Sequence, residues 1–393
     1  MFYGLAVDCG TSNLSLSLCR KGRPEQRRDL TAKNPCLRFG ADVITRAANA
    51  EKNENVRRLL VEELWQCVAE GAKTLCEQEG VRLTDVRRIS FCANPILTHL
   101  SLGLDAVELT RFPFSLKNRF LNFKQSAPFD LSRFGFHKRT RLFVAPLVSA
   151  FVGGDALLGF ADDETDEPSH FYTDLGTNGE MILKTPRGLF AASCAAGPAF
   201  EGGLVRCGMR AEEGAVEHAE YQDGAFVLDT VGGKEARGLC VGGLVEVLLA
   251  AFDAGLLSPN GEVKNEPLCI AENLTLTTEE VRAVLLAKAA FRAGARVLFS
   301  AANTSYETLC RFTLAGALGE HLNRQKAAEF GLFDPELLRL AKPKQNAALE
   351  GSARALWDRA FRRRCTTLAR STRSVDLASD PSFNETYVNS ISF

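Results

Sequence analysis

The sequence feature that most constrains this fold is a short motif that occurs twice. Asp8-Cys9-Gly10-Thr11-Ser12-Asn13 and Asp174-Leu175-Gly176-Thr177-Asn178-Gly179 both read Asp-x-Gly-Thr followed by small polar residues. Apolar and polar residues alternate on both sides of each motif, from Tyr3 to Leu18 and from His170 to Lys184, which predicts two β-hairpins. The motifs lie about one domain length apart, so we expect two duplicated domains that each open with the same hairpin.

The rest of the chain alternates between helical and strand-like patterns. Helical periodicity covers about 53–79, 95–102, 241–254 and 278–302, and short strand-like runs cover 88–92 and 141–144. This alternation predicts an α/β protein. We expect a first domain over 1–150 and a second over 151–393, with the C-terminal segment returning to the first.

Each Asp-x-Gly-Thr turn has the residue types that suit phosphate binding. Glycine at the tip lets backbone N–H groups approach phosphate oxygens, and the next residues add hydroxyl or amide donors. The expected phosphate ligands are Gly10, Thr11, Ser12, Asn13, Gly176, Thr177 and Asn178. Asp8 and Asp174, expected on exposed turns, supply the carboxylates that a hydrated Mg²⁺ bridging two phosphates requires. The alternative is that both motifs only make good hairpin turns.

A third aspartate follows a pair of glycines. Residues 150–160 read A-F-V-G-G-D-A-L-L-G-F, so Asp155 stands at the start of an apolar helix, just after Gly153 and Gly154. A carboxylate at this place can orient or deprotonate a nucleophile aimed at the γ-phosphate. The alternative is that Asp155 is the N-cap of the helix.

Two later stretches are rich in glycine. Residues 193–210 predict a loop and helix start that approach either a ligand or another backbone closely, with Gly197, Gly202 and Gly203 as candidate ligand contacts. Residues 312–322 predict a strand that enters a glycine turn before a helix, where Gly316 and Gly319 would let an adenine ring lie against the backbone. A turn that serves only packing is the equal alternative for this pair.

Composition and charge exclude several classes of partner. Lys plus Arg is 47 and Asp plus Glu is 48, and no dense basic stripe is visible, so we expect neither nucleic acid nor a membrane surface as partner. The 12 cysteines include no C-x-x-C pair, which predicts reduced thiols rather than a zinc or iron-sulfur site. No secretory signal or clean apolar span is present, so a cytoplasmic location is expected.

The motifs together resemble the actin-like ATPase superfamily, and more closely the ATPase module of the reductive activators of corrinoid-dependent methyltransferase systems. The residues that carry the closer resemblance are Asn34-Pro35, 39–44, 174–180, 193–202, 208–211, 287–290, 293–294, 314–319 and 380–383. This resemblance covers essentially the whole chain.

The resemblance implies an actin-like (ribonuclease H-like) ATPase fold, with two duplicated subdomains around a nucleotide cleft. It implies ATP and Mg²⁺ as cofactors, with Asp8, Asp155 and Asp174 as the catalytic group and with Asp8 and Asp174 as metal ligands. The implied activity is the ATP-dependent return of an oxidised corrinoid protein from cobalt(II) to cobalt(I).

In that family the electron enters through a fused iron-sulfur domain. This sequence shows no cysteine cluster, so we expect a separate ferredoxin-like electron donor. The oligomeric state is left open, with a homodimer as one option. Two alternatives remain at this point. One is a small-molecule kinase in which Asp155 deprotonates a substrate hydroxyl, and the other is a nucleotide-binding adaptor without a redox role.

Overall fold

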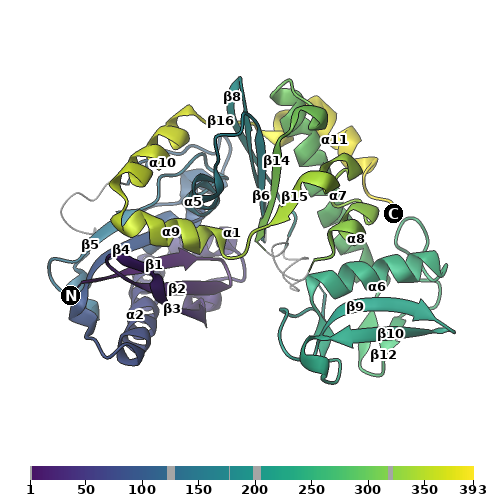
Figure 1. Cartoon of the computed structure of the whole chain (residues 1–393), viewed down its shortest axis with the longest axis horizontal. Coiled ribbons are helices and arrows are strands. Elements are labelled where there is room, and N and C mark those ends of the chain that lie inside the picture. The colour runs from purple at the N-terminus through teal and green to yellow at the C-terminus, as the bar shows by residue number, and fades with distance from the viewer. Residues whose placement is uncertain (1, 122–128, 177, 198–204, 317–321) are drawn as a thin grey trace. The chain divides into compact units, whose positions relative to one another are not determined.

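The computed structural model describes residues 2–121, 129–176, 178–197, 205–316 and 322–393 (Figure 1). The chain forms two compact units: unit 1 comprises Met1–Thr165 and Asn346–Thr372, and unit 2 comprises Asp166–Gln345 and Arg373–Phe393. This division differs from the boundary expected after residue 150, because helix α5 (Gly154–Asp163) packs against α9 (Ala347–Trp357) and α10 (Arg359–Ser371) of unit 1.

Unit 1 is built on a five-stranded sheet in the order β3-β2-β1-β4-β5. The strands are β1 (Tyr3–Cys9), β2 (Asn13–Arg20), β3 (Arg23–Lys33), β4 (Val86–Ala93) and β5 (Arg141–Val144). The first three are antiparallel, whereas β4 and β5 run parallel to β1. The predicted first hairpin and the strands near 88–92 and 141–144 are therefore confirmed.

Helices cover both faces of this sheet. Besides α5, α9 and α10 they are α1 (Val43–Lys52), α2 (Glu54–Gln78), α3 (Pro95–Ser101) and α4 (Val107–Thr110), with 3-10 turns at Pro35–Phe39, Leu83–Asp85 and Leu131–Phe134. Successive side chains of a strand point to opposite faces of the sheet, so β1 packs against helices on both faces. Leu5 and Val7 point into the core shared with α2, whereas Ala6 between them packs with Leu349 and Leu356 of α9.

Unit 2 repeats this plan. Its sheet has the order β15-β14-β6-β7-β8-β16. The strands are β6 (His170–Leu175), β7 (Gly179–Thr185), β8 (Gly188–Cys194), β14 (Arg311–Gly316), β15 (Ala341–Pro343) and β16 (Arg373–Ser374). An antiparallel β6-β7-β8 meander lies beside the parallel strands β14 and β15, as β1-β2-β3 lies beside β4 and β5. The second hairpin is confirmed, and each unit opens its sheet with one.

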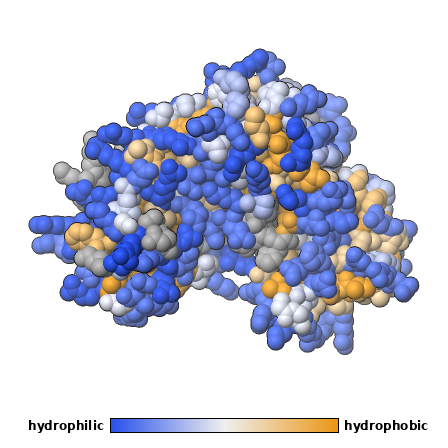
Figure 2. Space-filling model, in the orientation of Figure 1, coloured by the Kyte–Doolittle hydropathy of each residue, from blue (hydrophilic) through white to orange (hydrophobic). Residues whose placement is uncertain are grey.

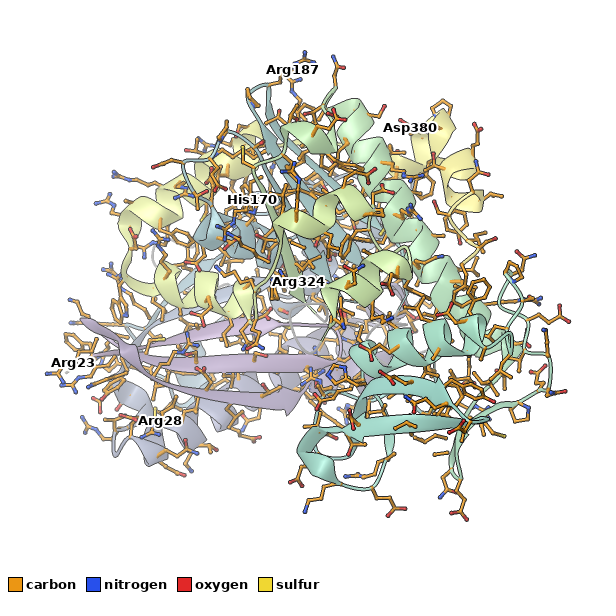
Figure 3. All side chains as sticks on the ribbon, turned by 45° about the vertical axis from the view of Figure 1, so that its right-hand side comes forward. Arg23, Arg28, His170, Arg187, Arg324 and Asp380 are labelled. Atoms are coloured by element: carbon orange, nitrogen blue, oxygen red, sulfur yellow. The ribbon has the colours of Figure 1, made fainter. Side chains whose placement is uncertain are left out.

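The remaining elements of unit 2 extend its core. They are the strands β9 (Ala215–Gln222), β10 (Ala225–Thr230), β11 (Gly238–Leu239), β12 (Leu268–Ala271) and β13 (Leu274–Leu276), a 3-10 turn at each of Val231–Gly233, Tyr306–Thr308, Pro335–Leu340 and Leu377–Ser379, and the helices α6 (Val241–Asp253), α7 (Thr278–Ala301), α8 (Arg324–Glu329) and α11 (Pro381–Val388). Helix α7 starts at the residue that the periodicity predicts, and a capping box of Thr277 and Glu280 fixes that start. His170 lies on β6 (Figure 3) and its Nε2 is 3.0 Å from the Thr313 hydroxyl on β14, across the parallel pair.

Most of the surface visible in Figure 2 is hydrophilic, with separate apolar patches. Within the described ranges, no helix combines the length and the apolar character that crossing a lipid bilayer requires.

Candidate functional site

The two aspartates of the repeated motif occupy equivalent places in the two units. Asp8 and Asp174 each stand one residue before the end of the first strand of their sheet, and both are half-buried. The expectation that they lie on exposed turns is wrong, because Cys9 and Leu175 still pair with the neighbouring strands. Both carboxylates therefore lie at the carboxyl end of a parallel strand pair, where ligands bind in open α/β sheets.

The loop after β1 has all of its carbonyl groups engaged. The Asn34 side-chain amide donates to the Gly10 carbonyl at 2.9 Å, and the Asn34 N–H donates to the Ser12 carbonyl at 2.9 Å. The Gly10 N–H closes the loop on the Asn13 carbonyl at 2.9 Å. The N–H groups of Thr11 and Ser12, by contrast, meet no acceptor in the described part of the chain. The loop thus turns its acceptors inward and leaves donors available, which suits an anion such as a phosphate.

The fourth carbonyl of this loop is held by a buried arginine. Arg46 on α1 is fully buried, and its Nη2 donates to the Thr11 carbonyl at 2.8 Å while its Nε donates to the Gly40 carbonyl at 2.8 Å. Among the described residues, its Nη1 has no hydrogen-bond partner and no carboxylate forms an ion pair with it. Burial lowers the pKa of the Arg46 guanidinium. A buried cation without a counter-ion is costly, so an anion bound at this loop would be stabilised by it.

The segment before Arg46 explains why this geometry forms. Gly40 has φ +151°, and a Cβ there would lie 2.9 Å from the Arg46 amide nitrogen, so the chain needs glycine at this turn. Asp42 then caps α1 by accepting the Thr45 N–H at 2.8 Å. Residues 39–44 carry part of the family resemblance, but the sequence alone predicts no role for Arg46. The sequence signal that could have identified it is an arginine one turn after Asp42, the residue that caps the helix.

Asp155 lies in the first turn of α5. The N-cap residue of this helix is Gly153, so the interpretation of Asp155 as the cap is wrong; its Oδ1 accepts the N–H of Ala156 at 2.9 Å. A Cβ on Gly153 would lie 2.5 Å from the Ala93 carbonyl, so glycine is needed to bring the helix start against the end of β4. Burial raises the pKa of the Asp155 carboxyl to about 6.

Cys92 on β4 contacts Asp8 and is influenced by the charge of Asp155. It is the cross-strand neighbour of Asp8, and its Sγ lies 3.9 Å from Asp8 Oδ1. Burial, followed by the charges of Asp8 and Asp155, raises the pKa of the Cys92 thiol well above its usual value. Cys92 thus stays protonated between two carboxylates. Asp8 and Asp155 of unit 1 therefore both act on one buried thiol, to which the sequence analysis assigned no role.

The equivalent edge of unit 2 gathers Asp174 with Gly316 and Glu180. The Tyr172 hydroxyl donates to Asp174 Oδ2 at 3.4 Å. Gly316 has φ +71°, and a Cβ there would lie 2.5 Å from both Asp174 Oδ1 and the Leu175 carbonyl. On β7, Glu180 stands directly across from Asp174, whereas the same place in unit 1 is held by Ser15. Sequence reasoning missed Glu180 as a neighbour of Asp174, because the pairing depends on the length of the turn.

The two hairpin turns differ by one residue. Four residues follow Cys9 before the next paired position, but three follow Leu175. In this second turn the Gly176 N–H donates to the Asn178 carbonyl at 3.0 Å.

Other predicted contacts are placed only in part. Ser193 and Cys194 end strand β8, so the loop expected from 193 starts later than predicted. Gly197 follows with φ +71°. The candidates that lie outside the described residues are Thr177, Gly202, Gly203 and Gly319.

All twelve cysteines are free. Among the residues that the structure describes, no group of three or more His, Cys, Asp or Glu side chains could hold a metal ion. A hydrated Mg²⁺ needs only one or two protein oxygens, so the absence of such a group does not bear on the expected Mg²⁺.

Comparisons with known proteins cover the whole chain. Residues 169–393 match the model described as the C-terminal domain of RACo, the ASKHA domain, and residues 3–166 match the RACo middle region. The chain is 27% identical over 428 residues to the corrinoid activation enzyme RamQ of Eubacterium limosum, covering 100% of this chain and 70% of the relative. It is 28% identical over 364 residues to the [Co(II) methylated amine-specific corrinoid protein] reductase of Methanosarcina barkeri, covering 84% of this chain and 65% of the relative.

A solved structure named as the reductive activator for corrinoid, iron-sulfur protein superposes with a TM-score of 0.87 at 26% identity, covering 100% of this chain and 66% of the other. The chain thus spans roughly two thirds of the length of these relatives. The expected actin-like fold is confirmed. Since the ASKHA-domain model alone matches more than half of its residues, this chain belongs to the RACo family.

Proposed function

We propose that this chain binds and hydrolyses Mg-ATP to drive the reductive activation of a corrinoid protein, in which cobalt(II) gains one electron and becomes cobalt(I). The observation that carries the nucleotide part is the loop after β1, whose carbonyls are all engaged while the N–H groups of Thr11 and Ser12 stay available. The corrinoid part is supported by the names of the relatives, one a corrinoid activation enzyme and another a corrinoid protein reductase.

The phosphates of ATP are bound by the two Asp-x-Gly-Thr loops in this proposal. Gly10 to Asn13 serve one unit, and Gly176 to Asn178 serve the other. Asp8 and Asp174 hold the hydrated Mg²⁺, which when bound neutralises phosphate charge. The adenosine end lies against Gly316 and Gly319 and the glycines Gly197, Gly202 and Gly203. The fit to the phosphates is supported by the buried charge of Arg46, which holds the Thr11 carbonyl of the first loop.

Asp155 orients the attacking water and accepts its proton. A carboxyl with a pKa of about 6 is mostly ionised at neutral pH, yet it is more basic than an ordinary aspartate. Its place beside Gly153, against the end of β4, fixes the carboxylate relative to Asp8 on the adjacent strand. Hydrolysis gives ADP and phosphate from ATP and water.

The electron for cobalt comes from a low-potential, ferredoxin-like donor. The twelve cysteines of this chain are free and are not grouped as cluster ligands among the described residues. A lone thiol does not relay single electrons at low potential. In this proposal the chain contributes binding of the corrinoid protein that ATP binding and hydrolysis control. Such control requires that the affinity for the corrinoid protein differ between nucleotide states.

The test is an anaerobic absorbance assay of the cobalt oxidation state, with corrinoid protein, electron donor and ATP each omitted in turn. We expect cobalt(I) only in the complete mixture. If ATP makes no difference while the donor is present, the proposal fails. ATP consumption that needs an added metabolite would instead favour the kinase, and absence of turnover with purified partner would favour the adaptor.

A further inference from the structure

Unit 1 carries an exposed group of phenylalanines that the nucleotide site does not use. Phe112 has 84% of its surface exposed and Phe151 has 40%. Phe114 joins them, because its ring centre lies 6.3 Å from that of Phe112 and 4.9 Å from that of Phe151. Large apolar side chains that cluster on the surface mark an interaction site more often than isolated ones do.

Helix α10 of the same unit carries exposed arginines that have no ion-pair partner among the described residues. The exposed face of α10 carries Arg359, Arg363 and Arg370, spaced so that they share one side of the helix. None of the three forms an ion pair with a carboxylate among the residues the structure describes, and α10 itself contains no acidic residue. Burial of Phe361, Cys365 and Leu368 on the opposite side explains the amphipathic pattern but not the choice of arginine for the outer side.

Two contacts link α10 to the chain segments that carry the phenylalanines. The Arg370 guanidinium lies 5.0 Å from the ring centre of Phe120. Arg119, next to Phe120, donates to the Ala369 carbonyl on α10 and to the Leu147 carbonyl at 3.1 Å, four residues before Phe151. We name this the Phe-Arg surface: Phe112, Phe114, Phe120, Phe151, Arg363 and Arg370.

From these contacts we propose that the Phe-Arg surface docks an acidic protein surface that has an apolar pocket for Phe112, and that this partner is the corrinoid protein. The assignment rests on the proposed function for the identity of the partner. Aromatic residues and arginine are the types enriched at the centres of protein interfaces.

Nucleic acid fits this surface less well than a protein does. The cations closest in sequence to Phe112 are already neutralised, Arg111 by Glu51 at 2.6 Å and Lys117 by Glu108. A phosphate backbone that passed Phe112 would therefore meet two carboxylates. A folded protein can instead set an apolar pocket over Phe112, with no charge facing Glu51 and Glu108, and set its acidic residues against Arg363 and Arg370.

The same surface is joined to the candidate catalytic aspartate. The N–H groups of Phe151 and Val152 donate to the Ser149 hydroxyl at 3.2 and 3.0 Å, which makes a tight turn that ends at Gly153. Asp155 follows in the first turn of α5. A partner that presses on the contact between Phe114 and Phe151 thus acts on the segment that positions Asp155, so docking is expected to stimulate hydrolysis.

The test measures binding of the purified cobalt(II) corrinoid protein that the wild-type chain reactivates, by biolayer interferometry, together with ATP turnover with and without that protein. The variants are Phe112→Ser and the pair Arg363→Glu with Arg370→Glu. Matched controls are Arg23→Glu, an exposed cation that starts β3 (Figure 3), and Val227→Ser, an exposed apolar residue of β10.

We expect each test variant to weaken binding about tenfold or more and to lose stimulated turnover, with basal turnover and both controls unchanged. Wild-type binding by the test variants would overturn the docking assignment. A second result would also overturn the docking assignment. In it, the test variants lose binding to a single-stranded DNA oligonucleotide but still bind the corrinoid protein. If no corrinoid protein is bound or reactivated by the wild-type chain, the proposed function fails, and the partner assigned to this surface fails with it.

Discussion

Arg46 takes no part in the proposed hydrolysis step, but its buried charge should strengthen the binding of the nucleotide phosphates. Arg46→Met keeps a long apolar side chain in the same space but removes the charge and two hydrogen bonds, to Thr11 and Gly40. We expect Mg-ATP to bind much more weakly while the affinity for adenosine stays unchanged. The physical reason is that only the phosphates respond to a cation behind the loop.

The size of the effect follows from electrostatics. At an effective dielectric constant of ~20, a unit charge ~10 Å from a phosphate charge contributes about 1.7 kcal/mol, which is about 17-fold in affinity. The free energy of unfolding should change far less. Leaving the two carbonyls unpaired costs ~1–3 kcal/mol each, but replacing a buried, uncompensated charge by an apolar group offsets much of that.

The assay is calorimetric titration of wild type, Arg46→Met and Arg46→Lys with Mg-ATP, Mg-ADP and adenosine, with thermal unfolding recorded in parallel. Arg46→Lys keeps the charge and should recover part of the lost affinity, although it cannot reach both carbonyls. Wild-type affinity for Mg-ATP in folded Arg46→Met would show that the Arg46 charge does not strengthen phosphate binding. Equal losses for adenosine and ATP would show that the arginine only maintains the fold.

Other predictions address the aspartates and one glycine. Asp8→Ala or Asp174→Ala should remove most Mg-dependent ATP turnover in a folded protein, measured as phosphate release; wild-type turnover in folded Asp174→Ala would exclude the shared metal site. Asp155→Asn should lower turnover by ~10²- to 10⁴-fold with little change in nucleotide affinity. A parallel fall in both would make Asp155 structural. Because burial raises the pKa of Asp155 to about 6, turnover should rise with pH through about 6 and then level off; a profile flat from pH 5 to 8 would contradict the general-base role. Gly316→Ala should weaken nucleotide binding, because its Cβ would lie 2.5 Å from Asp174 Oδ1. An unchanged nucleotide affinity in calorimetric titration would show that the end of β14 shifts to accommodate the methyl group.

Local patterns predicted much of the fold. Both hairpins, the helix over Glu54–Gln78 and the start of α7 were visible in the sequence, because period-two alternation, helical spacing and capping residues act over a few neighbouring positions. The glycine pair before Asp155 similarly located a helix start.

The parts that the sequence could not predict depend on pairing between distant segments. Cys92 faces Asp8 only because β4 is parallel to β1 in one particular register. Glu180 faces Asp174 because the second turn is a residue shorter than the first. The exposure of the two aspartates was misjudged for the same reason, since neighbouring strands pair beyond the point where the turn motif begins.

The most direct test of the central claim records phosphate release and cobalt(I) formation in one anaerobic reaction, with titanium(III) citrate as electron donor, for wild type and for Asp155→Asn. We expect both signals to rise together with the wild-type chain and both nearly to vanish with Asp155→Asn, although this variant still binds ATP. Cobalt(I) that forms at the wild-type rate with Asp155→Asn would contradict the claim that hydrolysis by this chain drives the reduction.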